Sequence, residues 1–70
     1  MNIESIGTWA GAVYKALENQ DTKMLGLKQA KKATKLKKDQ IMAALGWLGR
    51  EGKITLTMED EDLVIALVEA

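Results

Sequence analysis

The chain has 70 residues, of which 47% are hydrophobic and 29% are charged, so we expect a single domain over residues 1–70. It contains no cysteine and no histidine, which excludes a disulfide framework, a thiolate metal site and the commonest general base. The longest apolar run, Leu63 to Val68, is far shorter than a membrane span. We therefore expect a soluble cytoplasmic protein with no membrane partner.

The formal net charge is zero, but the charges are segregated along the chain. Residues 22–53 hold nine Lys or Arg against two acidic residues, a local net charge of +7. Residues 54–70 hold five acidic residues and no basic one. Because a partner responds to the local field, the basic middle and the acidic tail say more about binding than the total does.

The first predicted element is a helix over about residues 3–19. Apolar residues recur there at spacings of three and four, at Ile3, Ile6, Ala10, Val13 and Leu17. Asn2 precedes this stripe and is a favourable N-cap residue. Gly7 and Gly11 lower the helix propensity and are consistent with a face that another backbone approaches closely.

A very short strand is predicted at residues 22–24, followed by a second helix over about 26–33 and a third over about 38–51. The turn between these helices is Thr34-Lys35-Leu36. With Lys37 as the N-cap of the third helix, Gln40 takes the position of the glutamine in a capping box. Gly52 fits the position after this helix where a positive φ is commonly needed.

The last third of the chain predicts a β-hairpin. Residues 54–58 alternate between apolar and polar, and residues 63–68 form the second strand. A turn centred on Asp60-Glu61 sets inward residues opposite one another, in the pairs Met58 with Leu63, Leu56 with Ile65, and Ile54 with Leu67. A four-residue loop over Glu59–Asp62 is equally acceptable at this point.

This order of elements is that of a winged helix-turn-helix. The run from Ala44 to Ile54, which contains the pattern G-W-L-x-R-E-G-K, together with Ile6-Gly7 and Ala10-Gly11, resembles a small bacterial winged-helix family labelled a domain of unknown function. The resemblance implies an α+β fold with three helices, a C-terminal two-stranded wing and a short third strand. It also makes nucleic-acid binding a reasonable expectation.

A cluster of lysines is the first candidate site, and double-stranded DNA is its candidate partner. It consists of Lys28, Lys31, Lys32, Lys35, Lys37 and Lys38. In helix-turn-helix proteins these elements lie against the phosphate backbone, where ammonium groups release counterions. Gln40 and Arg50 are the residues expected to reach a groove. The alternative is a solvated surface that only keeps the protein soluble.

The third helix has an exposed face that is poor in residues that read bases. That face is predicted to carry Asp39, Met42, Ala43, Gly46, Gly49 and Arg50. Base recognition typically uses Arg, Lys, Asn or Gln, so this face favours backbone contact with weak sequence readout. The alternative function is homodimerisation or binding of another protein. Its candidate interface residues are Met42, Gly46 and Gly49 on the helix and Val64, Ala66 and Val68 on the outer face of the hairpin.

The acidic run Glu59-Asp60-Glu61-Asp62 forms the predicted wing tip and opposes contact with DNA. Its spacing is not that of a calcium-binding loop. Without His, Cys or carboxylates paired in apolar surroundings, no acid–base constellation is visible. We therefore predict a non-enzymatic protein with no cofactor, metal or small-molecule substrate, acting as a DNA-binding protein in transcription regulation.

Overall fold

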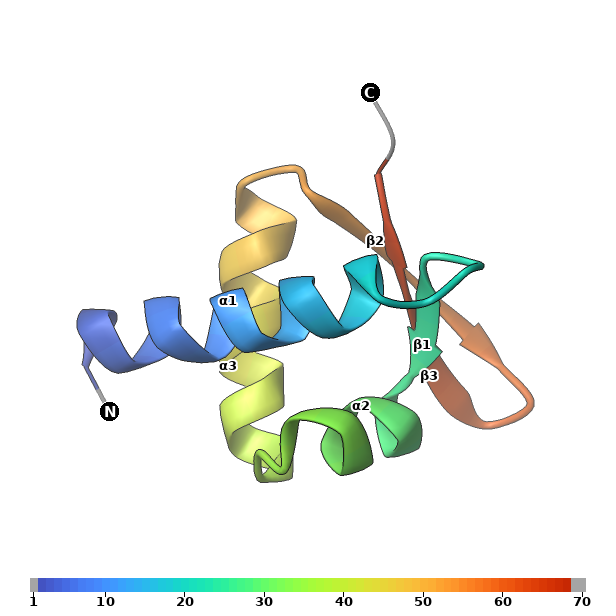
Figure 1. Ribbon diagram of the computed structural model, residues 1–70, viewed down its shortest axis with the longest axis horizontal. Coiled ribbons are helices and arrows are strands. Elements are labelled where there is room, and N and C mark those ends of the chain that lie inside the picture. The colour runs from blue at the N-terminus through green and yellow to red at the C-terminus, as the bar shows by residue number, and fades with distance from the viewer. Residues whose placement is uncertain (1, 69–70) are drawn as a thin grey trace.

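The computed structural model describes residues 2–68 and consists of three helices and a three-stranded antiparallel sheet (Figure 1). The elements are α1 (Ile3–Glu18), β1 (Met24–Gly26), α2 (Leu27–Thr34), α3 (Lys38–Arg50), β2 (Ile54–Glu59) and β3 (Asp62–Leu67). The predicted α+β winged helix-turn-helix architecture is confirmed, including the short third strand.

Helix α1 crosses α3 and covers one side of the core (Figure 1). It begins as predicted, because the Asn2 Oδ1 atom accepts a 2.8 Å hydrogen bond from the Ser5 backbone N–H. At its other end, the Lys23 ammonium group donates to the Glu18 carbonyl at 2.6 Å. Both ends therefore satisfy backbone groups that a helix leaves unpaired.

The sheet has the order β1-β3-β2, and the predicted hairpin register is confirmed pair by pair. The predicted position of the short strand, residues 22–24, is wrong by two residues, because the strand is Met24–Gly26. Lys23 has a φ of 58°, which extended backbone does not allow, so the strand begins after it. This start places the buried Leu25 opposite Ile65.

The hairpin turn has only two residues, which decides between the two loops that the sequence left open. Glu59 pairs directly with Asp62, while Asp60 and Glu61 have φ values of 49° and 65°. Positive φ at both central residues defines a type I′ turn, for which Asn-Gly is the favoured sequence. Asp60 is among the residues that tolerate this conformation, whereas Glu61 holds it at a cost.

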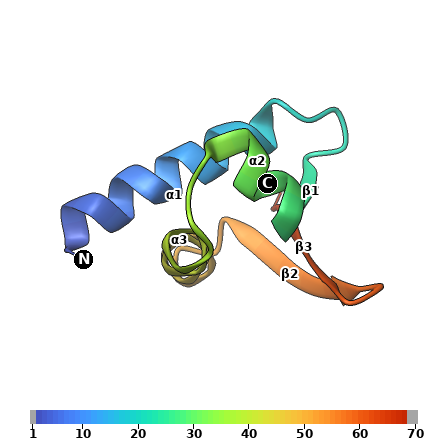
Figure 2. The same ribbon diagram turned by 90° about the horizontal axis from the view of Figure 1, so that it is seen from below.

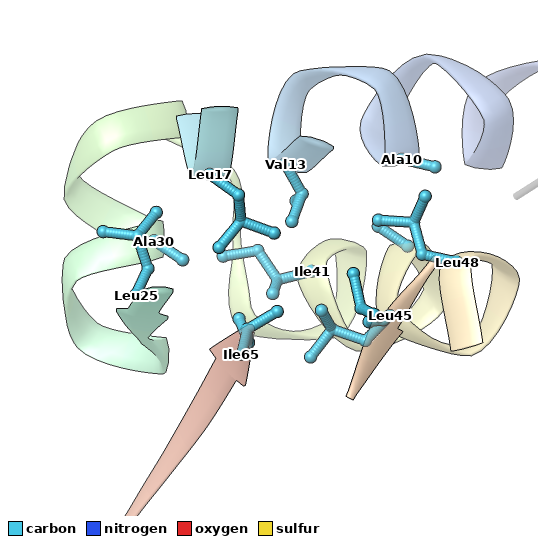
Figure 3. Close-up of a cluster of buried hydrophobic side chains, with 11 residues drawn as sticks. Ala10, Val13, Leu17, Leu25, Ala30, Ile41, Leu45, Leu48 and Ile65 are labelled. Atoms are coloured by element: carbon cyan, nitrogen blue, oxygen red, sulfur yellow. The ribbon is translucent and has the colours of Figure 1, made fainter. Parts of the chain in front are cut away.

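The core is a single apolar cluster between α1, α3 and the inner face of the sheet (Figure 3). Its largest fully buried side chains are Val13, Leu17, Ile41, Leu45 and Ile65. The cluster contains no buried polar or charged residue among those described. The stripe predicted for α1 is buried only from Ala10 onward, and Ile3 is 71% exposed.

Two further expectations are corrected by the packing. Leu56 and Met58 lie in the predicted register but are 47% and 66% exposed, because the wing extends past the end of the core. A Cβ atom added to Gly7 or Gly11 meets nothing within 4 Å. Within residues 2–68, therefore, no backbone approaches these glycines closely.

The type I′ turn yields a stability prediction. Replacing Asp60→Asn and Glu61→Gly together supplies the residues that the turn favours, and we expect the free energy of unfolding to rise by about 1 kcal/mol. The measurement is urea denaturation at high salt, where removal of two carboxylates has little electrostatic effect.

The matched control is Gly52→Ala. Gly52 has a φ of 72°, so a Cβ there strains the backbone and we expect a loss of about 1 kcal/mol. An unchanged or lower stability of the hairpin variant would show that the turn conformation is not as described.

Candidate nucleic-acid interface

Helix α2 presents one face to the core and one lined with lysines. Ala30 is fully buried. Four exposed lysines follow the spacing i, i+3, i+4 and i+7 along one side of α2 and its C-cap, namely Lys28, Lys31, Lys32 and Lys35. Residues at this spacing lie along one face of a helix, and we call this face the basic stripe. Of the six lysines predicted as a cluster, three lie on α2 and a fourth is its C-cap, while Lys37 and Lys38 lie at the start of α3.

The turn after α2 is held by local hydrogen bonds. The Thr34 hydroxyl donates to the Ala30 carbonyl at 2.7 Å and accepts the Leu36 N–H at 3.2 Å. Lys35 is the C-cap in the left-handed conformation, with a φ of 61°, and its N–H donates to the Lys31 carbonyl at 2.8 Å. Glycine is the usual residue at such an αL position after a helix, so this lysine occupies a strained place in the turn.

The start of α3 brings two further lysines to the same end of the molecule. Lys37 is the N-cap and uses only its backbone there, so its ammonium group is not needed to cap the helix. The Gln40 Oε1 atom accepts the Lys37 N–H at 2.9 Å, as the capping box predicted. Gln40 is half-buried. Its side chain, which was predicted to reach a groove of the DNA, is held at the helix start by this hydrogen bond.

A groove of about 420 Å³ lies between α2, the start of α3 and the wing, and we call it the α3–wing groove. Lys28, Lys31 and Lys38 line it together. Figure 2, seen from below, shows α2, the start of α3 and the wing around this side of the molecule. Met42 of α3 and Met58 of the wing contribute apolar side chains to the groove and are 45% and 66% exposed.

Acidic residues of the wing also line the α3–wing groove, at Glu61 and Asp62. The Asp62 carboxylate lies against Gly26, the N-cap of α2, since a Cβ on Gly26 would clash with its Oδ2 atom. The positive end of the helix dipole favours an anion at this place. Asp62 therefore packs against the start of α2 and stabilises it, whereas Asp60 and Glu61 form the wing tip.

Arg50 lies apart from the lysines. It is the last residue of α3, and twelve helical steps of 1.5 Å separate it from Lys38 by about 18 Å. It lines a different hollow of about 290 Å³ with Trp47 and Glu51. The structure thus brings Lys28, Lys31 and Lys38 together and leaves Arg50 at the opposite end of the helix.

The six residues predicted as a partner interface fall on two separate surfaces. Gly46 and Gly49 are exposed on α3. Met42 lies nearer the start of this helix and lines the α3–wing groove. Val64 and Ala66 alternate with the buried Ile65, so they face away from the core. Val68, just after β3, is 49% exposed. The helix face and the outer hairpin face, which the sequence offered as alternative interfaces, are therefore two separate surfaces.

The wing side of the α3–wing groove was not predicted from the sequence. Met58, Leu63 and Glu61 line it together with the lysines. The hairpin register alone predicted which wing residues share a face, but it did not show where the wing lies relative to α2. That position depends on β1, whose pairing places α2 beside β3.

A helix-turn-helix formed by α2 and α3, followed by a β2–β3 wing, defines a winged-helix protein. The chain belongs to the family described as winged helix-turn-helix domain (DUF2582), whose family model matches residues 1–67. A search of the curated proteins found no match.

Two further features of residues 2–68 concern metal binding and membranes. No group of three or more His, Cys, Asp or Glu residues in this range is placed to hold a metal ion. None of the helices described is both long and apolar enough to cross a membrane.

The strained turn residue gives a prediction for this site. Lys35→Gly relieves the left-handed conformation, and we expect the free energy of unfolding to rise by about 1 kcal/mol. Urea denaturation measures it, with Lys32→Gly as the control. Lys32 lies within α2, so glycine there costs up to about 1 kcal/mol. A loss of stability in both variants would contradict the turn geometry.

Proposed function

We propose that this protein binds duplex DNA by contacting its phosphate backbone with the basic stripe, Lys37 and Lys38, and that it reads little or no base sequence. The observation that carries the proposal is the gathering of these lysines on α2 and the start of α3. Residues 28–38 contain six lysines and no acidic residue. In helix-turn-helix proteins the first helix of the motif crosses the backbone, which supports this assignment.

The exposed face of α3 supports weak sequence readout. Between Lys38 and Arg50 it offers Met42, Gly46 and Gly49, which have no side chain that hydrogen-bonds a base edge. The exposed Asp39 is an acceptor for cytosine only, and its charge repels phosphate. Gln40 is engaged in the helix cap through its oxygen atom. Phosphate contacts position a protein on DNA without specifying sequence, and this surface offers mainly such contacts.

The acidic wing tip sets the direction of approach. Asp60 and Glu61 repel phosphate, so we propose that DNA lies over the basic stripe and the start of α3 rather than along the wing. A backbone-binding protein of this kind would act in the cytoplasm, and occupancy of promoter DNA would give it a role in transcription regulation.

The test is a titration of random-sequence duplex at several salt concentrations, followed by fluorescence anisotropy. With six phosphate contacts, log K should fall against log salt with a slope of about −5. Lys31→Gln should reduce the magnitude of that slope by about 0.9, because one contact is lost.

The matched control is Lys15→Gln, which removes an equally exposed lysine from α1. It should leave the slope unchanged. Binding that is absent at low salt, indifferent to salt, or equally reduced by both variants would contradict the proposal.

The wing tip gives a further prediction. Glu61 lines the α3–wing groove beside the lysines, so Glu61→Gln should raise the affinity for duplex about two- to five-fold at low salt. Glu18→Gln, an exposed acidic residue on α1, is the control and should change the affinity less. A lower affinity of Glu61→Gln would place the wing tip in contact with DNA rather than in opposition to it.

Protein–protein association is the second candidate function, favoured by exposed apolar side chains such as Met42 and Val68. Light scattering at two salt concentrations separates the modes of association. A charge-driven complex dissociates as salt rises, whereas an apolar one does not.

A further inference from the structure

Strand β2 is an edge strand whose outer side is open. The sheet order is β1-β3-β2, so β2 pairs with β3 along one of its edges only. No other described strand lies along the second edge of β2 (Figure 2). All of its residues after Ile54 are exposed. An exposed edge presents unpaired N–H and C=O groups that can pair with another strand.

The hydrogen bonds to β3 determine which residues of β2 face the free edge. The Val68 N–H donates to the Lys53 carbonyl at 3.0 Å, so Lys53 and the odd-numbered residues after it direct their backbone groups toward β3. Ile54, Leu56 and Met58 therefore direct theirs outward. Any strand that extends the sheet at this edge must pair with these three residues.

The edge lacks the features that usually protect one. Natural edge strands carry proline, a bulge or a charge in mid-strand. The segment of β2 from Ile54 to Met58 has no proline, bulge or charged residue. The nearest charges are Lys53, just before the strand, and Glu59, its last residue. This placement permits pairing and makes the ends electrostatically complementary in an antiparallel arrangement.

We infer that the free edge of β2 binds the same strand of a second copy of this chain, antiparallel, with the two-fold axis at Leu56. Leu56 then lies opposite Leu56 of the second copy, and Ile54 opposite its Met58. On the other face Thr55 lies opposite Thr57 and Lys53 opposite Glu59, so every pair matches in polarity and the end charges are opposite. Three bonded pairs of two hydrogen bonds each give about six bonds across the junction.

The neighbouring registers fit less well. Because the even-numbered residues of β2 direct their backbone groups outward, the neighbouring registers differ from the inferred one by two residues, so that even-numbered residues still oppose one another. A shift in one direction places Glu59 opposite Glu51 of the second copy, which is repulsive. The opposite shift pairs Ile54 with Asp60, which lies in the hairpin turn and is not extended.

The result is a continuous sheet of order β1-β3-β2-β2-β3-β1 with the helices of both copies on the same face. Its contact area is modest, so the dimer is weak and depends on protein concentration. The inference stands apart from the proposed DNA binding, because it uses no residue of the basic stripe. Its tests contain no nucleic acid.

The first test uses the absence of cysteine from the chain. Thr55→Cys and Thr57→Cys each introduce one exposed thiol. In the inferred register Thr55 and Thr57 of the second copy form a non-hydrogen-bonded pair with Cα atoms about 4.5 Å apart, within disulfide reach. Two identical variants bring their thiols only to diagonal positions, about 7–8 Å apart. Mild oxidation of an equimolar mixture should therefore give mixed disulfide dimers several-fold faster than either variant alone.

The second test exchanges the end charges and measures the dimer by sedimentation equilibrium at low salt. Lys53→Glu and Glu59→Lys should each weaken the dimer, and the double variant should restore it. Within one chain these residues lie at opposite ends of β2, so no intrachain pair between them explains a rescue. Lys53 Nζ also lies 5.8 Å from the centre of the Tyr14 ring, a contact that both variants with Glu at position 53 lose equally.

The inference is overturned if the wild-type protein is monomeric over its whole soluble range. It is also overturned if each cysteine variant crosslinks alone as fast as the mixture, or if the double charge variant stays as weak as the single ones. Leu56→Lys offers a check on folding, because Leu56 is about half exposed. It should abolish the dimer by placing two ammonium groups on the axis, while the circular dichroism stays that of the wild type.

Discussion

The packing of α1 against α3 is the constraint on which the rest of the structure depends. Val13 and Leu17 of α1 and Ile41 and Leu45 of α3 are all completely or almost completely buried, with Ile65 of β3 closing the cluster. A chain of this size buries little apolar surface, so nearly all of its core lies at this junction. Because the core uses one stripe of each helix, α2 is left with one small buried residue, Ala30, and a face free for lysines.

Four of the described residues other than glycine have a positive φ, at the start of β1, in the helix-turn-helix and at the wing tip. They are Lys23, Lys35, Asp60 and Glu61; Lys35 and Glu61 stand where Gly or Asn is the usual residue, whereas Asp is common at the position of Asp60. Strained positions tend to persist where function requires them. At Lys35 and Glu61 a charged residue stands where stability alone favours Gly or Asn.

Hydrophobic periodicity and the pairing of residues across the hairpin predicted most of the fold, because both depend on local sequence. The hairpin register and the Lys37–Gln40 cap followed from spacing alone. The start of β1 did not, since it depends on the left-handed Lys23 and on the tertiary partner of Leu25. The same holds for the α3–wing groove, whose lining from Lys31 to Met58 is assembled by contacts between distant segments.

We propose that the lysines on α2 and the start of α3 form a phosphate-binding surface. The most direct measurement is the change of backbone amide chemical shifts when duplex DNA is added to isotope-labelled protein at low salt. We expect the shifts to change mainly within residues 28–38, with little change around Lys15 of α1. Changes centred on the wing tip or on α1, or none at any DNA concentration, would contradict it.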